Sequence, residues 1–304
     1  MGQGVGNVNV PRDKAVIRSI CWMLVSCLMF ATVMACIRYF LSDLPPEQTV
    51  FLRYLIGVGL MAPLVFARLP ELATTQHRGK FVLRFMLHGL GVYTWFYAVL
   101  RLPLADVNAL LNLGPIYATL GAVLLFGERL RLRRMMAILI SFMGALIVIK
   151  PGFAAFTLGT LAILATAPLF AFSDLIAKEL KAHHDDNLII FALSLGISAL
   201  LLVPALYVWL PMNGSEWFGI CAVAVCATIG HVTLMRAFRG PMWAAQSGKY
   251  VQLVFVVGYG IVLFDEIPAI STLIGAVIVC SAVTFIAIRE SQLSREKPPV
   301  HPAG

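Results

Sequence analysis

Ten apolar stretches, each about 20 residues long, dominate this sequence of 304 residues. A helix of about 20 apolar residues crosses about 30 Å of hydrocarbon, so each stretch is long enough to span a bilayer. The chain is 12% charged, against about 25% in soluble domains, which excludes an ordinary soluble protein. The pattern predicts an all-α membrane protein whose spans cover residues 17–41, 47–67, 81–100, 103–126, 132–149, 157–177, 187–210, 216–238, 241–264 and 268–288.

Basic residues are unevenly divided between the two sides that these spans define. Eighteen of the 23 lysines and arginines fall on the side of the N-terminus, two fall on the other side, and three lie within spans. Short loops rich in lysine and arginine stay in the cytoplasm. The bias predicts that both termini are cytoplasmic and favours the inner membrane of a bacterium. It also explains the net charge of +8 without a nucleic-acid partner.

The chain resembles itself at a nearly constant offset. A shift that aligns YAVLRLPLADVNALL (97–111) with MRAFRGPMWAAQSGK (235–249) also places Glu128 on Glu266. A nearly equal shift places Phe30 on Phe170. The constant offset predicts a duplication of five helices, in which residues 17–149 and 157–288 are the repeats and residues 1–16 and 289–304 are cytoplasmic tails.

An odd number of spans in each repeat has a consequence for orientation. After five crossings the second copy starts on the opposite side of the membrane, so the two halves have inverted topology. Inverted repeats are typical of secondary transporters, which expose a central site to each side in turn. The duplication therefore predicts transport by alternating access.

The repeated stretches resemble the EamA type of the drug/metabolite transporter superfamily. The resemblance is strongest in LPLADVNALLNLGPIYATLGAVLLFGERLRLRRMMAILISFMGALIVIKPG and in GHVTLMRAFRGPMWAAQSGKYVQLVFVVGYGIVLFDEIPAISTLIGAVIVCSAV. It implies ten helices around a central cavity lined mainly by spans 1, 3, 4, 6, 8 and 9. The superfamily moves amino acids, other metabolites and drugs, so the resemblance names neither a substrate nor a coupling ion, and it implies no cofactor.

Two symmetry-related helix faces carry hydrogen-bonding side chains. Asn108 and Asn112 lie one helical turn apart and so share one face of span 4. The offset that aligns the repeats places Gln246 and Tyr250 at the equivalent positions of span 9. Such faces would converge at the interface of the repeats, where transporter sites lie.

Lys249 lies within an apolar span, about 12 Å from its start at Pro241. A charge inside a bilayer costs about 2.5 to 3.5 kcal/mol on insertion scales, so we expect Lys249 to face a wetted cavity and bind a substrate carboxylate. The alternatives are an ion pair with Asp174 and snorkelling toward the cytoplasm.

Aromatic and acidic side chains supply further candidates. Tyr93 and His231 occupy equivalent positions and could line the site, since aromatic rings suit organic solutes. Asp174 and Asp106 are candidates for coupling or gating, although pairing of Asp174 with Lys178 one turn later is an equal alternative. Arg38 and Arg53 are expected to snorkel or pair near a membrane surface, and His88 is expected to satisfy a local hydrogen bond.

The favoured function is secondary transport of small organic metabolites, especially amino acids or related carboxylates, with export as the direction. The partners are a solute and the lipid bilayer, with coupling to protons or to exchange of solutes. A carrier of aromatic heterocycles or drugs is the alternative, suggested by the aromatic faces. An intramembrane enzyme is disfavoured because the spans contain no His-x-x-x-His or acidic metal-ligand spacing, and a nucleotide-driven pump because no phosphate-binding loop is present.

Overall fold

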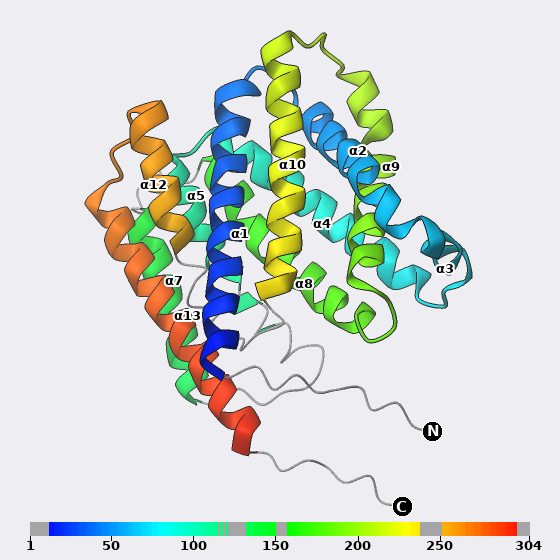
Figure 1. The fold of residues 1–304 in the computed structure, drawn as a ribbon. Coiled ribbons are helices and arrows are strands. Elements are labelled where there is room, and N and C mark those ends of the chain that lie inside the picture. Colours follow the sequence, from blue (N-terminus) through cyan, green and yellow to red (C-terminus); the bar gives the residue numbers. More distant parts are fainter. Residues whose placement is uncertain are drawn as a thin grey trace, which may run out of the picture.

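The computed structural model describes residues 12–114, 116–117, 120, 132–149, 157–237 and 251–296, and these residues contain helices and no strands (Figure 1). Their elements are α1 (Arg12–Phe40), α2 (Pro46–Val65), the 3-10 helix η1 (Phe66–Arg68), α3 (Leu69–Thr74), α4 (Arg78–Val99), α5 (Leu104–Leu111), α7 (Leu132–Ile149), α8 (Leu158–Leu180), α9 (Asp186–Tyr207), α10 (Gly214–Ala237), α12 (Val251–Phe264) and α13 (Ile270–Glu296). The all-α prediction holds for this described part of the chain.

The helix boundaries follow local sequence signals. Asp185 precedes α9 and its side chain accepts a hydrogen bond from the Asn187 amide at 2.9 Å, which caps an otherwise unpaired amide. Thr157 caps α8 in the same way through the Thr160 amide. Both helices begin close to the starts of the spans predicted from hydrophobic length.

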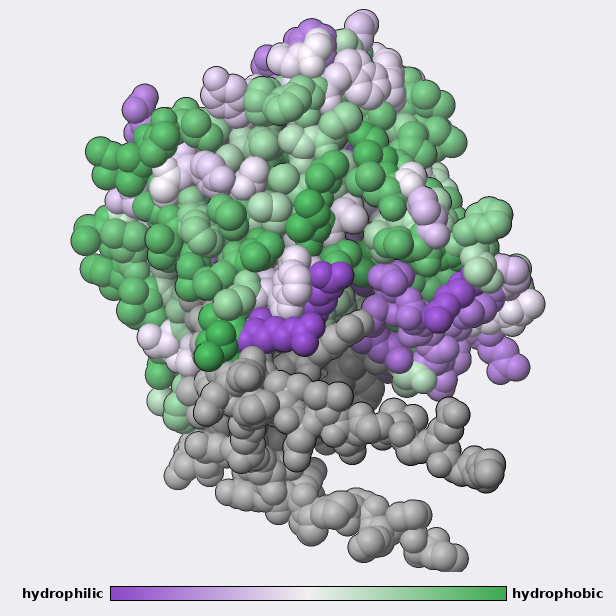
Figure 2. All heavy atoms as spheres, in the orientation of Figure 1, coloured by the Kyte–Doolittle hydropathy of each residue, from purple (hydrophilic) through white to green (hydrophobic). Residues whose placement is uncertain are grey.

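An apolar exterior surrounds the bundle. Among the described residues, five stretches are long and apolar enough to cross a membrane, namely Ile17–Phe40, Pro46–Thr74, Leu158–Ala177, Asp186–Tyr207 and Gly214–Ala237. Exposed leucines and valines, among them Leu64, Val203 and Val262, cover the outside. Figure 2 shows this apolar surface over most of the visible face, with hydrophilic side chains gathered toward the lower right. The exterior is that of an integral membrane protein.

The lower end of the bundle carries ion pairs. α1 begins and α13 ends at this end in Figure 1, which is the arrangement expected for an even number of crossings. Arg68 pairs with Asp185 at 3.1 Å and Lys80 with Glu179 at 2.6 Å, on helices and joins close to this end. The cytoplasmic orientation of this end and the count of ten crossings remain predictions.

Helices from the two predicted repeats pack against each other in pairs. α1 packs on α10 and α4 packs on α8, while α2 packs on α9 and α7 on α13. In the predicted duplication α1 corresponds to α8, and α10 corresponds to α4. The α1–α10 pair is therefore the counterpart of the α4–α8 pair. The reciprocal pairing supports a duplicated unit, whereas its inverted orientation stays a prediction.

Matched contacts hold the α1–α10 and α4–α8 pairs together. A Cβ atom at Gly230 of α10 would lie 3.2 Å from the Phe30 ring of α1, and one at Gly91 of α4 would lie 2.8 Å from the Phe170 ring of α8. The two phenylalanines are equivalent under the offset of the repeats, and the two glycines are equivalent to within one position. Small residues let membrane helices approach closely, so each crossing is closed by one ring over one glycine.

Hydroxyl groups repeat the same correspondence. Ser26 of α1 donates to the Gly230 carbonyl at 2.9 Å. Thr166 of α8, which the offset places on Ser26, lies 2.8 Å from the hydroxyl of Thr94, which in turn donates to the Gly91 carbonyl at 3.0 Å. Hydrogen bonds thus link α1 to the turn of α10 that contains Gly230, and α8 to the turn of α4 that contains Gly91. In both crossings the first helix of one predicted repeat meets the third helix of the other.

Candidate functional site

Five polar side chains from α2, α4 and α10 gather in the interior of the bundle. Arg53 and Tyr54 lie on α2, Arg84 and His88 on α4, and His231 on α10. All except the partly buried His231 are at most 8% exposed. We call these residues the cationic cluster. Charged side chains inside a membrane protein are costly and mark functional positions.

Direct contacts join the members of the cluster. The Arg53 Nη2 atom lies 3.4 Å from His231 Nε2, and the Arg53 guanidinium lies 3.9 Å from the centre of the Tyr54 ring. The ring centroids of His88 and His231 are 6.5 Å apart. Residues from both predicted repeats therefore share one polar interior.

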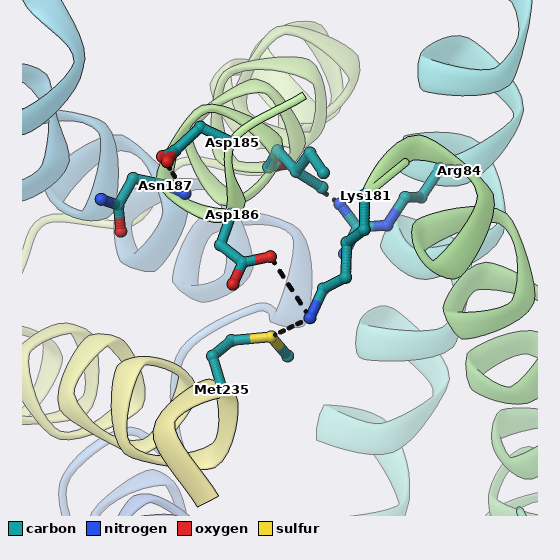
Figure 3. Close-up of polar contacts among 7 residues, drawn as sticks. Arg84, Lys181, Asp185, Asp186, Asn187 and Met235 are labelled. Atoms are coloured by element: carbon teal, nitrogen blue, oxygen red, sulfur yellow. Dashed lines mark hydrogen bonds and ion pairs between the residues drawn. The ribbon is translucent and has the colours of Figure 1, made fainter. Parts of the chain in front are cut away.

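Arg84 reaches across the bundle from α4 to α9. Its Nη1 atom donates to the Ile189 carbonyl at 3.1 Å, a contact drawn in Figure 3. The Nε atom of Arg84 is buried and has no hydrogen-bond partner among the described residues. An N–H donor of a guanidinium group is therefore unsatisfied inside the protein, which is unfavourable unless another acceptor arrives.

The Tyr54 hydroxyl is a second unsatisfied group. Tyr54 is 2% exposed, and its hydroxyl makes no hydrogen bond of normal geometry with a described residue. The hydroxyl is close enough to Arg53 and Arg84 to interact electrostatically with both. Two unpaired donors thus belong to one cluster, on two helices that pack together.

Asp174 supplies negative charge next to the cluster. This α8 carboxylate interacts electrostatically with Arg84, and the preceding residue, Ser173, lies 3.2 Å from His88 Nδ1 through its hydroxyl. Both guanidinium groups of the cluster are buried, whereas Asp174 is exposed. The arrangement can therefore attract an anionic group.

Aromatic rings form part of the walls. Phe170 stacks on His88 with a centroid distance of 4.8 Å, and Phe30 meets His231 edge to face at 5.1 Å. These are the same phenylalanines that close the two helix crossings over Gly91 and Gly230. The crossings consequently position both histidines of the cluster.

A small pocket of about 140 Å³ lies near the lower end, between α9 and α10. Val232 lines it and follows His231 in the chain, and Ile190 lines it and follows Ile189. Lys181, at the end of α8, lies 3.3 Å from Asp186 and 2.9 Å from the Met235 sulfur, as Figure 3 shows. Lys181 therefore links α8, α9 and α10 beside this pocket.

A second polar contact region lies at the upper end in Figure 1, and we call it the Glu266 junction. Glu266 follows α12, pairs with Arg38 of α1 at 2.5 Å and accepts the Leu104 amide of α5 at 3.0 Å. Arg38 also donates to the Leu102 carbonyl at 2.9 Å. One carboxylate thus connects three helices and caps the first turn of α5.

Of the predicted site residues, His231 lies in the cluster and Tyr93 lies apart from its contacts. The Tyr93 hydroxyl donates to Glu47 at 3.0 Å, at the start of α2. Asp106 accepts a 2.6 Å hydrogen bond from Thr272 and lines a hollow of about 360 Å³ beside the Glu266 junction. Tyr93 and Asp106 are thus held by partners outside the cluster.

The predicted amide face is buried. Asn108 is 1% exposed and its Nδ2 atom has no hydrogen-bond partner among the described residues. The Asn112 amide lies 3.9 Å from the Cys280 sulfur on α13. The equivalent positions Gln246 and Tyr250, and the neighbouring Lys249, lie outside the described residues.

Two arginines of the cluster differ from what the sequence pattern indicates. The pattern places Arg53 near a membrane surface and Arg84 among the basic residues of the cytoplasmic side. The structure buries both side chains, and both residues lie inside their helices rather than at the first turn. A guanidinium at an apolar helix position, such as Arg53, is the signal in the sequence that could have located the cluster.

Comparison with known proteins gives the wider relationship. The model of the EamA-like transporter family matches residues 17–150. The predicted resemblance is thereby confirmed, and the matched residues include Arg53, Arg84 and His88 of the cluster.

Curated relatives extend the similarity over most of the chain. A pseudopaline exporter of Pseudomonas aeruginosa is 26% identical over 83% of this chain and 90% of its own length. A riboflavin transporter of Vibrio cholerae is 27% identical over 91% and 95%, and an S-adenosylmethionine uptake transporter of Rickettsia prowazekii is 22% identical over 93% and 97%. These relationships support a transporter role for this membrane protein.

A solved crystal structure shares the fold. It aligns with a TM-score of 0.60 at 20% identity and covers 91% of this chain and 100% of its own. At this identity the likeness concerns the architecture alone.

Proposed function

We propose that this protein is a secondary transporter that moves small organic metabolites across the cytoplasmic membrane by alternating access, with export as its direction. The observation that carries the proposal is the position of the cationic cluster between two reciprocal crossings. The α1–α10 crossing contributes Phe30 and His231, and the α4–α8 crossing contributes Phe170 and His88. A polar site between two repeats is the arrangement on which alternating access depends.

The proposed mechanism uses the two repeats, residues 17–149 and 157–288, as the moving units. Rocking of one unit against the other would change the α1–α10 and α4–α8 contacts together, because each crossing joins the two units. Both termini would remain in the cytoplasm. Asp174 and Asp106 are the candidates for coupling to protons or to exchange, and Asp174 is favoured because it interacts with Arg84 of the cluster.

Amino acids and related carboxylates are the favoured solutes. Buried guanidinium groups bind carboxylates through charge-assisted hydrogen bonds, and a relative is named as an exporter of pseudopaline. The proposed contacts combine His231 with the residues predicted from the repeat faces, namely Asn108, Asn112, Gln246, Lys249, Tyr250 and Tyr93.

A carrier of aromatic heterocycles is the second candidate. The stacked Phe170 and His88 rings and the Phe30 contact with His231 favour it, since flat solutes bind well to aromatic walls. Relatives are named as transporters of riboflavin and of S-adenosylmethionine, and both of these compounds contain a heteroaromatic ring.

Counterflow into proteoliposomes tests the proposal. Vesicles loaded with unlabelled amino acids, riboflavin or S-adenosylmethionine are diluted into labelled solute, and protein-free vesicles serve as the background. We expect labelled carboxylates to accumulate above background. Absence of accumulation for every solute would reject the transporter proposal, and accumulation confined to neutral heterocycles would favour the second candidate.

The same vesicles test the role of Lys249. We expect Lys249→Ala to lower carboxylate flux at least tenfold, while the matched surface variant Lys80→Ala, which loses only an exposed ion pair with Glu179, keeps it. Undiminished flux of every transported solute in Lys249→Ala would reject the assigned role.

A further inference from the structure

We propose that Arg53, Arg84 and Tyr54 form the carboxylate-binding part of the substrate site, so that the transported solutes are small organic compounds that carry a carboxylate group. The inference rests on the proposed transport function and deepens it by naming the group that is recognised. It places this recognition on α2 and α4, whereas the sequence pattern placed it on Lys249 and the two amide faces.

The unpaired donors point to a ligand. Arg84 Nε and the Tyr54 hydroxyl are buried, carry one hydrogen-bond donor each, and have no acceptor among the described residues. A buried donor without a partner destabilises the fold that contains it. Both donors would be satisfied by one group with two or more acceptor oxygens, and a carboxylate is such a group.

The charge of the cluster agrees with a single carboxylate. Asp174 interacts with Arg84 and offsets one of the two guanidinium charges. The contacts of Arg53 are with a histidine ring nitrogen and with the face of Tyr54, and neither carries negative charge when neutral. A bound carboxylate would offset the positive charge of the two buried guanidinium groups, which lowers the cost of burying that charge.

The existing contacts of Arg84 and Tyr54 leave one donor of each residue available to a ligand. Arg84 uses Nη1 for the Ile189 carbonyl and keeps Nε available, while Tyr54 lies under the Arg53 guanidinium at 3.9 Å and keeps its hydroxyl available.

Benzoate and its neutral analogue benzamide form a matched pair of probes for this site. Binding to the full-length protein in lipid nanodiscs is measured by calorimetry for each probe. We expect benzoate to bind at least about tenfold more tightly than benzamide, a difference worth about 1.4 kcal/mol. Equal binding of the two probes would overturn the proposal.

Tyr54→Phe separates recognition from folding. Because the hydroxyl has no partner among the described residues, its removal should not lower the thermal midpoint of the protein. It should weaken benzoate binding at least about tenfold, the loss of one hydrogen bond to a charged group, and leave benzamide binding unchanged. Unchanged benzoate binding in this variant would overturn the role of Tyr54 and with it the proposal.

Arginine variants complete the experiment. Arg53→Gln and Arg84→Gln should each weaken benzoate binding more than tenfold, whereas Arg68→Gln, which removes a half-exposed arginine paired with Asp185, should not change it. Benzoate binding with this pattern but no flux of any solute would reject the transport function and keep the anion site. Carboxylate flux that persists in Tyr54→Phe and both cluster arginine variants would reject the anion site and keep the transport function.

Discussion

Three arginines lie on apolar helices in different surroundings. Arg38 belongs to the Glu266 junction, and Arg53 and Arg84 belong to the cationic cluster. Arg38 pairs with Glu266 and donates to the Leu102 carbonyl. In the cationic cluster, Arg84 interacts with Asp174 while Arg53 contacts His231 and Tyr54. Arg84 Nε and the Tyr54 hydroxyl have no partner among the described residues.

The comparison separates structural charges from functional ones. A charge whose hydrogen bonds are complete contributes to the fold, and a binding site must keep donors open for its ligand. The Glu266 junction is therefore expected to control stability, and the cluster to control binding and flux. Substitutions in the Glu266 junction should lower stability more than flux, and substitutions in the cluster should lower binding and flux more than stability.

Glu266→Ala should have the largest effect on stability. It leaves Arg38 without its carboxylate and removes the acceptor of the Leu104 amide, and loss of a buried ion-pair partner costs about 3 to 5 kcal/mol. Because both side chains are about one-fifth exposed, we expect a smaller loss of about 2 kcal/mol, measured by unfolding in detergent. The double variant Arg38→Met with Glu266→Gln keeps an acceptor for Leu104 and should recover more than half of the loss.

Gly91→Ala should disturb the wall of the cluster. The new Cβ would lie 2.8 Å from the Phe170 ring, which stacks on His88, and overpacking costs about 1 to 3 kcal/mol. We expect a lower unfolding midpoint together with weaker solute binding. The control Gly59→Ala, where a Cβ meets nothing within 4 Å, should be neutral or stabilising. Equal behaviour of the two variants would contradict the close crossing.

Arg53→Met should sharpen the contrast with Arg38. The variant removes a buried charge whose described contacts are aromatic rings, so we expect the unfolding free energy to change by less than about 1 kcal/mol. Flux of carboxylate solutes should fall at least tenfold. A large destabilisation would assign Arg53 to the fold, and retained flux would remove it from the site.

Asp265→Gly should have the smallest effect. Asp265 adopts φ 53° directly after α12, so the helix ends on a residue in the left-handed conformation. The Glu266 amide then donates to the Gly260 carbonyl at 2.9 Å. Glycine adopts this conformation without steric cost, so we expect a gain of about 0.5 kcal/mol in unfolding free energy. A loss would show that the Asp265 side chain itself stabilises the junction.

Much of the fold could be predicted from the sequence. Hydrophobic length located the helices, and the nearly constant offset of the repeats anticipated that α1 and α8 would have matching partners. The equivalence of Phe30 and Phe170 is an example, since both rings lie over a glycine of the opposite repeat. Such patterns can be recognised in a sequence because every backbone polar group within the bilayer must be hydrogen-bonded internally, which requires a continuous helix along the span.

The candidate site was less accessible to sequence reasoning. His231 was identified and lies in the cluster, and the hydrogen bond expected of His88 is made with Ser173. Arg84 was assigned to the cytoplasmic side because a linear pattern gives the position of a Cα atom and not the direction of a long side chain. Tyr93 was paired with His231 by symmetry, yet its hydroxyl bonds Glu47.

The amino-acid sequence by itself determined the helical membrane fold, because this depends on hydrophobic length and periodicity, and it predicts the correspondence between the repeated helices. Only the tertiary structure decided which charges are paired. Arg38 meets Glu266, and Arg53 meets His231, from opposite halves of the chain, where no local pattern relates them. Whether a buried donor finds an acceptor depends on such distant contacts, and this decides between a structural charge and a binding site.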